Sequence, residues 1–200
     1  MTASVRPLLP QLETDRLVLR LGAEGDVEEI VRYFSTNRDF LRPFDPRRPE
    51  VFYSPSFWSG QVRQSVADER MDRAVRFFLF YRGTGEVIGT ANFTQIRRGV
   101  SHSCTLGYGL AEAHQGKGLM REALQPAIEH IFDVRLLHRI EANYMPHNVR
   151  SGKLLRRLGF VVDGHARDYL LIDGKWEDHI LTSLTNPKWG ADGSSEVGGE

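Results

Sequence analysis

The segment HQGKGLMREAL, residues 114–124, places two glycines and a lysine between a predicted strand and a predicted helix. Glycine disfavours helix by about 1 kcal/mol relative to alanine, so Gly116 and Gly118 are unexpected directly before one. A glycine turn lets several backbone N–H groups converge on one anion, and a helix N-terminus adds about half a positive charge. The segment therefore predicts a phosphate site, although a simple glycine turn would leave the same pattern.

Two common phosphate-binding motifs do not match this segment. The nucleoside-triphosphate loop requires Ser or Thr after G-x-x-x-x-G-K, whereas Lys117 is followed by Gly118 and Leu119. The dinucleotide motif G-x-G-x-x-G also fails, because the position that requires its last glycine is occupied by Arg121. ATPase and dehydrogenase functions are therefore disfavoured.

Composition and charge predict a cytoplasmic, single-domain protein. The 26 basic and 26 acidic residues cancel, so the overall charge gives no attraction to nucleic acid or to an anionic membrane. No apolar run approaches the roughly 20 residues of a membrane span. Cys104 is the only cysteine, and the seven histidines show no short ligand spacing, so neither a disulfide nor a metal site is expected.

Periodicity and capping residues predict the elements that position the glycine segment. Strands are expected at 16–21, 75–82, 87–96, 103–110 and 138–145, with a final hairpin turning at Asp173-Gly174. Helices are expected from an Asp26–Glu29 capping box to about Ser35, from the Ser54-Pro55 pair, from the glycine segment to about Phe132, and over 148–160. Pro126 should bend or loosen the third helix. This order predicts an α/β (α+β) sandwich, with one domain over 11–188, a mobile arm at 1–10 and a disordered tail at 189–200.

The glycine segment also fits the pattern Q-x-x-G-x-[GA], with Gln115, Gly118 and, in place of the last small residue, Met120. Nearly in register, the chain resembles the RimJ/RimL-type protein N-terminal acetyltransferases of the GCN-five-related (GNAT) superfamily, and most of all the RimJ branch. The matching blocks are NFTQIRRG, LGYGL, HQGKGLMREAL, HRIEANYMPHNVRSGKLLRRLGF and DYLLIDGKWEDHILTSLT. The resemblance covers roughly residues 13–188 and implies the GNAT fold, a mixed and mostly antiparallel sheet with helices on both faces.

The resemblance implies acetyl-CoA as cosubstrate and no metal. The coenzyme pyrophosphate would meet backbone N–H groups of the glycine segment, and the pantetheine arm would pair with the free edge of the splayed strand before it. The implied coenzyme-binding residues are Tyr108, Gly109, Leu110, Gln115, Gly116, Lys117, Gly118, Leu119, Met120, Asn148 and Ser151. Asn148 is equally suited to be a helix N-cap, and both roles can coexist.

The candidate catalytic residues are a serine and a glutamate, with two tyrosines as alternatives to the serine. Ser151 matches a serine proposed to protonate the departing thiolate, with Tyr144 and Tyr169 as alternative donors. Glu141 stands where related enzymes place a glutamate base, although an ion pair with Arg139 would explain it equally well. An N-terminal amine has a pKa of about 7.7–8.0, so a base need supply little at neutral pH.

Acceptor recognition is expected in the variable segments. The candidate substrate-binding residues are Phe40, Phe44, Tyr169 and Trp176, for which core packing is the alternative. The RimJ resemblance implies transfer of acetyl to the N-terminal alanine of a small-subunit ribosomal protein, by direct attack of the amine on the thioester. A monomer or weak dimer is expected, with ribosome association left open. The alternatives are acetylation of another N-terminus or a small amine, and a non-catalytic CoA-binding regulatory module.

Overall fold

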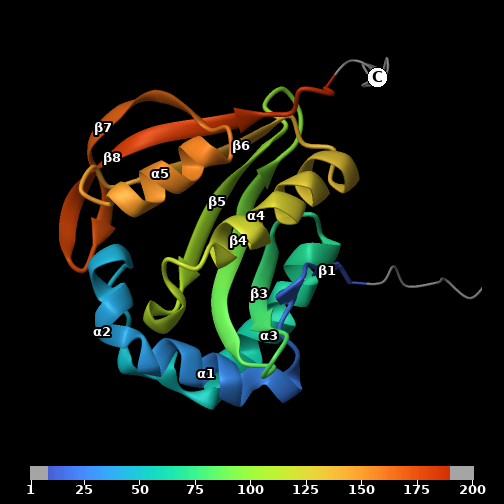
Figure 1. Ribbon diagram of the computed structural model, residues 1–200, viewed down its shortest axis with the longest axis vertical. Helices are drawn as coiled ribbons and strands as arrows, with labels where there is room; N and C mark the ends of the chain where they lie inside the picture. Colours follow the sequence, from blue (N-terminus) through green and yellow to red (C-terminus); the bar gives the residue numbers. More distant parts are fainter. Residues whose placement is uncertain (1–8, 190–200) are drawn as a thin grey trace, which may run out of the picture.

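One mixed sheet of eight strands forms the centre of the protein in the computed structural model, which describes residues 9–189 (Figure 1). The strand order is β1-β2-β3-β4-β5-β6-β8-β7, and among these neighbours only β5 and β6 run parallel. This confirms the mixed, mostly antiparallel sheet. The strands are β1 (Gln11–Glu13), β2 (Leu17–Arg20), β3 (Val75–Tyr81), β4 (Val87–Arg97), β5 (Ser103–Leu110), β6 (Arg139–Tyr144), β7 (Val161–Ile172) and β8 (Lys175–Thr185). Most of the predicted N-terminal arm and C-terminal tail, at 1–8 and 190–200, lies outside the described residues.

Helices cover both faces of the sheet, as predicted. The helices are α1 (Val27–Thr36), α2 (Arg38–Leu41), α3 (Pro55–Arg70), α4 (Leu119–Glu129) and α5 (Val149–Arg157). Phe77 and Phe78 are consecutive on β3, so their side chains point to opposite faces. Phe77 packs in the core that contains α4, whereas Phe78 packs in a second core with α1 and α3. Within residues 9–189, no helix is long and apolar enough to cross a membrane.

The ends of three helices test the predicted capping residues. Ser54 caps α3 through its hydroxyl, and Asn148 caps α5, each accepting a backbone N–H as predicted. The predicted Asp26–Glu29 capping box is wrong. The carboxylate of Asp26 instead accepts the backbone N–H of Ala23 at 2.7 Å and pairs with Arg20 of β2. This tertiary ion pair draws Asp26 away from the helix, so α1 begins after a 3-10 turn at Glu24–Asp26.

Pro126 lies inside α4, and the helix continues through it. Because proline has no N–H, the backbone carbonyl of Glu122 lacks its usual partner four residues later. The backbone changes to a wider π-helical turn at His130–Val134, one turn beyond the proline. The loosening predicted at Pro126 is therefore not seen at the proline itself, where the α-helix is continuous.

The turn between β7 and β8 packs against the segment that follows α2, and Figure 1 shows the two side by side. Asp173 and Gly174 both have positive φ, which confirms the predicted two-residue turn. The backbone N–H of Asp173 donates to the carbonyl of Asp45 at 3.0 Å. The guanidinium groups of Arg42 and Arg47 lie 3.6 and 3.8 Å from the Asp173 carboxylate. The hairpin thus holds the residue 42–47 segment in place.

Candidate active site

Strands β5 and β6 separate where the site begins. Their parallel pairing runs from Ser103–Arg139 to Thr105–Glu141 and stops there, although β5 continues to Leu110. The splayed strand implied by the resemblance is therefore present. A cavity of about 850 Å³ opens beside the free part of β5, between the glycine segment, α5 and residues 40–46.

The two glycines turn the chain from β5 into α4. Gly116 and Gly118 have φ values of +74° and +76°, a left-handed conformation that L side chains rarely adopt. Gly118 is the N-cap of α4, and both glycines line the cavity together with Leu119. The side-chain amide of Gln115 donates to the carbonyl of Leu110 at 2.8 Å and ties the loop to the strand end. The glycines are therefore required by backbone geometry, and they bring the helix N-terminus to the cavity.

Hydrogen bonds from Thr14 and Arg16 to the glycine segment and to α4 were not predicted from the sequence. Arg16 donates to the carbonyl of Lys117 at 3.1 Å and to the Glu122 carboxylate at 2.7 Å. Thr14 donates to the same carboxylate at 2.6 Å. Burial acts to raise the pKa of Glu122, but these hydrogen bonds outweigh it and hold that pKa below its usual value. Lys117 does not line the cavity, so the structure does not bring its side chain to the predicted phosphate position.

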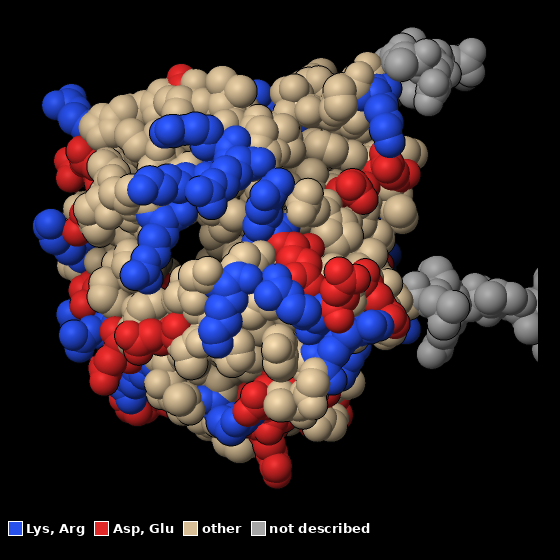
Figure 2. Space-filling view, viewed as in Figure 1, with Lys and Arg blue, Asp and Glu red and all other residues tan. Residues whose placement is uncertain are grey.

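Four cations line this cavity: Arg121 at the start of α4, and Arg150, Lys153 and Arg157 on α5. None of them forms an ion pair within residues 9–189, and the single acidic side chain in the lining is Asp45. Figure 2 shows a hollow in this face bordered by Lys and Arg side chains. Unpaired cations beside a left-handed glycine turn and a helix N-terminus fit a ligand with several phosphates.

Tyr108 and Ser151 meet in the cavity. Their hydroxyl oxygens lie 2.7 Å apart, and the backbone N–H of Ser151 donates to the side-chain oxygen of Asn148 at 3.2 Å. Burial raises the pKa of Tyr108 to about 12, with the hydrogen bond to Ser151 opposing the shift. The hydroxyl of Tyr108 therefore stays protonated at neutral pH. Tyr144 also lines the cavity. The hydrogen bond between Tyr108 and Ser151 was not predicted from the sequence.

Gly152 makes room for the ring of Tyr144. A Cβ at position 152 would lie 2.7 Å from Cε2 of that ring, closer than real Cβ contacts come. We expect Gly152→Ala to destabilise the protein by about 1–3 kcal/mol in denaturant unfolding, because the ring must move. In the control Gly60→Ala, on α3, nothing lies within 4 Å of the new Cβ, so stability should rise by up to about 1 kcal/mol. Equal stability of the two variants would contradict this packing.

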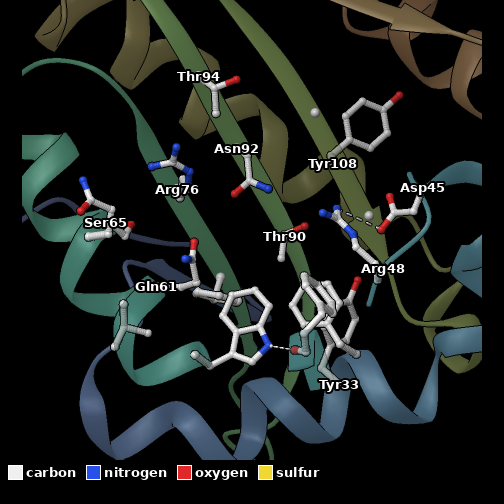
Figure 3. Close-up of a pocket in the computed structure, with 18 of the residues that line it drawn as sticks. Tyr33, Asp45, Arg48, Gln61, Ser65, Arg76, Thr90, Asn92, Thr94 and Tyr108 are labelled. Carbon is white, nitrogen blue, oxygen red and sulfur yellow. Dashed lines mark hydrogen bonds and ion pairs between the residues drawn. The ribbon is translucent and has the colours of Figure 1, made fainter. Parts of the chain in front are cut away.

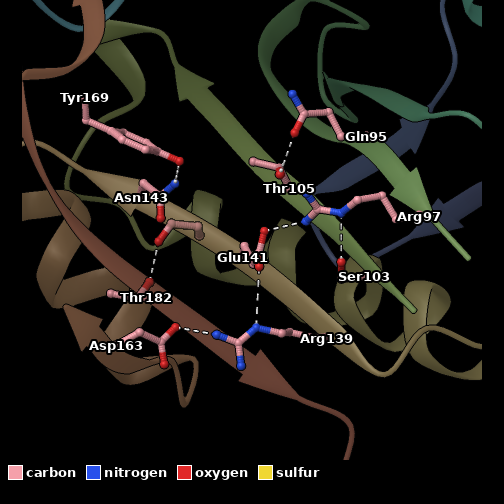
Figure 4. Close-up of polar contacts among 11 residues, drawn as sticks. Gln95, Arg97, Ser103, Thr105, Arg139, Glu141, Asn143, Asp163, Tyr169 and Thr182 are labelled. Atoms are coloured by element: carbon pink, nitrogen blue, oxygen red, sulfur yellow. Dashed lines mark hydrogen bonds and ion pairs between the residues drawn. The ribbon is translucent and has the colours of Figure 1, made fainter. Parts of the chain in front are cut away.

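Glu141 does not line this cavity, nor a second cavity on the α1 and α3 side of the sheet. Its carboxylate pairs with Arg97 at 2.6 Å and with Arg139 at 3.6 Å, as Figure 4 shows. It stands at the last paired position of β5 and β6, before the strands separate. The ion pair that the sequence left open as an alternative is therefore present, and the structure does not bring this carboxylate to Ser151.

A second cavity of about 460 Å³ lies on the α1 and α3 side of the sheet (Figure 3). Aromatic residues form one part of its wall, including Tyr33, Phe52 and Trp58, and polar side chains of α3 and β4 form another. The two cavities share five lining residues, which are Leu41, Asp45, Gly107, Tyr108 and Gly109. They therefore meet at the free end of β5.

The predicted acceptor residues fall in different places. Phe40 and Phe44 line the first cavity, with their ring centres 6.5 Å apart. Tyr169 and Trp176 line neither cavity. The hydroxyl of Tyr169 accepts a long hydrogen bond from Asn143 at 3.4 Å, whereas Trp176 is 57% exposed. The lining residues that the sequence reasoning missed include Asp45, Met145, Leu170, His179 and the three cations of α5.

Comparison with known proteins identifies the family of this chain. Residues 16–161 match the Acetyltransferase (GNAT) domain family. The chain belongs to this family. It is 48% identical over 179 residues to the [ribosomal protein uS5]-alanine N-acetyltransferase of Escherichia coli K12. The match covers 90% of this chain and 92% of the relative. The resemblance to the RimJ branch and the GNAT fold are thereby confirmed.

Two solved structures of GNAT enzymes match the fold closely. The ribosomal-protein-S5-alanine acetyltransferase of Vibrio fischeri superposes with a TM-score of 0.87 at 38% identity, over 90% of this chain and 98% of that one. RimJ of Mycobacterium smegmatis, in complex with CoA-disulfide, gives a TM-score of 0.81 at 28% identity, over 86% and 83%. GNAT acetyltransferases use acetyl-CoA, and the cationic first cavity suits this coenzyme.

Proposed function

We propose that this enzyme acetylates the N-terminal alanine of ribosomal protein uS5, using acetyl-CoA. The observation that carries the proposal is the 48% identity, over nine-tenths of the chain, to a relative named for that reaction. Two cavities that meet at one strand end support it, since a transferase must bring two substrates together. The acceptor implies action in the cytoplasm. A monomer or weak dimer, and ribosome association, stay predictions.

We propose the first cavity as the acetyl-CoA site. Backbone N–H groups from Gln115 to Met120 would hold the pyrophosphate, and the free edge from Tyr108 to Leu110 would pair with the pantetheine arm. Acetyl-CoA, when bound, supplies an acetyl group activated as a thioester. A backbone N–H of β5 directed at the carbonyl oxygen would stabilise the charge that develops there, an effect worth about 3–4 kcal/mol in comparable sites.

We propose that the neutral N-terminal amine attacks the thioester directly. Ser151, hydrogen-bonded to Tyr108, would give the departing sulfur its proton, with Tyr144 as the alternative donor. Glu141 would act as base only through solvent, since two arginines hold it outside both cavities. Burial raises the pKa of the Cys104 thiol to about 12, which argues against a covalent acetyl-cysteine.

The cations of α5 allow a test of the coenzyme site. We expect Arg157→Ala to weaken acetyl-CoA binding by about 3- to 10-fold at low salt, and by less at high salt, because a charge facing the phosphates is lost. Arg156 is the matched control, since it is exposed, lies on the same helix and does not line the cavity. Titration calorimetry at two salt concentrations measures both variants. Equal loss in both would show that the effect is not local.

The acceptor is tested with purified uS5 of E. coli and acetyl-CoA, followed by mass spectrometry of the intact protein and its peptides. We expect one acetyl group, placed on the N-terminal amine. A polyamine and an aminoglycoside, assayed in parallel, cover the small-amine alternative. Acetylation of these amines with uS5 left unmodified would overturn the proposal.

A further inference from the structure

Asp45 stands at the junction of the two cavities. Within residues 9–189 it is the one acidic side chain that lines both. It follows the 3-10 turn at Arg42–Phe44, and its carbonyl accepts the backbone N–H of Asp173 from the β7–β8 turn. Its side chain keeps 36% of its exposure, so a ligand can reach the carboxylate.

Among residues 9–189, the carboxylate of Asp45 has one charged partner, and the contact is long. The guanidinium of Arg48 lies 3.5 Å away, and Figure 3 shows the two side chains directed toward each other. The same guanidinium lies over the ring of Phe52, 4.7 Å from its centre. Burial raises the pKa of Asp45, and the charge of Arg48 opposes the shift. A second cation at this point would therefore improve the electrostatics of the carboxylate.

The other acid in the second cavity is already engaged. Asp68 pairs with Arg76 at 2.6 Å and accepts a hydrogen bond from Gln64 at 2.8 Å. These contacts hold the pKa of Asp68 below its usual value, although burial acts to raise it. Asp45 is thus the carboxylate in this cavity with capacity for a cationic ligand.

Asp45 also lies close to the strand end where acyl transfer is proposed. A Cβ built on Gly109 would be 3.3 Å from the hydroxyl of Tyr33, so that hydroxyl borders β5. Burial raises the pKa of Tyr33, and the negative charge of Asp45 adds to this shift. Tyr33, Asp45 and Gly109 therefore border one small region, which both cavities reach.

We propose that Asp45 binds the α-amino group of the arriving acceptor as its ammonium ion, and that Arg48 holds the carboxylate at the junction. The bound ammonium then releases one proton to solvent, and the neutral amine that remains attacks the thioester. The inference rests on the proposed function and names the residue that positions the amine. The aromatic wall of Tyr33 and Phe52 would exclude water and strengthen the contact. Asp45 is then a specificity residue for free N-termini, since a blocked N-terminus carries no charge to pair with it.

The test is a thermodynamic cycle on the CoA-bound protein. One peptide begins with a free alanine, and its partner carries a propanoyl group there, which removes the amine alone. We expect the wild type to bind the amine-free peptide about 10- to 100-fold more weakly, the usual range for a charged hydrogen bond. In Asp45→Asn most of that difference should disappear, because the protein then has no carboxylate at this position to pair with the amine of the alanine peptide.

Asp39→Asn is the matched control, since Asp39 is exposed, lies on the neighbouring helix α2 and lines neither cavity. It should keep the full wild-type difference. The inference is overturned if Asp45→Asn discriminates between the two peptides as well as the control does. Should Asp45→Asn fail to fold, as judged by its melting curve, the same cycle on Asp45→Ala decides. If the wild type neither binds nor acetylates the alanine peptide, the proposed function itself has failed, and this inference with it.

Discussion

Gly118→Pro is expected to reduce acetyl-CoA affinity by at least about 100-fold, the largest effect that this site predicts. Gly118 has φ = +76°, whereas proline fixes φ near about −65°, so the turn into α4 cannot keep its shape. The substitution also removes the backbone N–H of Gly118, which is the N-cap of α4 and lines the cavity. Loss of one charged hydrogen bond accounts for about 10- to 100-fold, and displacement of the neighbouring N–H groups adds to it. Titration calorimetry with acetyl-CoA measures the change.

Gly99→Pro is the control for this prediction. Gly99 has a similar φ of +67° and open space around it, but it lies in the turn between β4 and β5 and lines neither cavity. The two prolines introduce comparable backbone strain, so their effects on melting temperature should be similar. Only Gly118→Pro should lose the coenzyme. Wild-type affinity in a folded Gly118→Pro protein would show that this loop does not bind it.

Ser151→Ala is expected to lower kcat by about 100-fold, because a positioned general acid contributes at least this much. The affinity for acetyl-CoA should change little, since the backbone contacts remain. Tyr108→Phe removes the other half of the 2.7 Å hydrogen bond and should lower kcat by a similar factor. If the two hydroxyls deliver one proton together, the double variant will be no slower than the slower single variant.

Steady-state kinetics of the two single variants and the double variant make this test. Tyr169→Phe is the control. Within the described part of the chain, its hydroxyl makes only the long contact with Asn143, and it lines neither cavity. Full kcat in Ser151→Ala would mean that the serine supports packing or capping alone. Additive losses would mean that Tyr108 and Ser151 act independently.

Much of the fold was predictable because the deciding interactions are local. Asn148 and Gly159 mark the ends of α5 through N-cap and left-handed geometry, and Asp173-Gly174 sets the last hairpin. The capping box predicted at Asp26 is wrong because Arg20, on β2, pairs with the Asp26 carboxylate. β1 spans three residues, too few for alternation to be visible in the sequence.

The site was predictable where one segment carries it, and less so where distant segments meet. The glycines of HQGKGLM made the turn into α4 predictable, because glycine adopts a left-handed φ more readily than any other residue. Spacing along one face of a helix could have revealed Arg150, Lys153 and Arg157 as a group. No local pattern marks Asp45, whose position depends on a hairpin far along the chain. The position of Glu141 outside both cavities also depends on a distant segment, because one of its two arginine partners comes from β4 and the other from its own strand.

The most direct test of the account is transfer to a set of short peptides that begin with Ala, Ser, Met or acetyl-blocked Ala, each with an internal lysine. The enzyme is incubated with acetyl-CoA, and the products are located by fragmentation mass spectrometry. We expect acetylation of the free alanine α-amine ahead of serine and methionine, with the blocked peptide and every lysine unmodified. Acetylation of lysine in the blocked peptide with the alanine terminus untouched would contradict it. So would the absence of transfer to any peptide by a protein that binds acetyl-CoA.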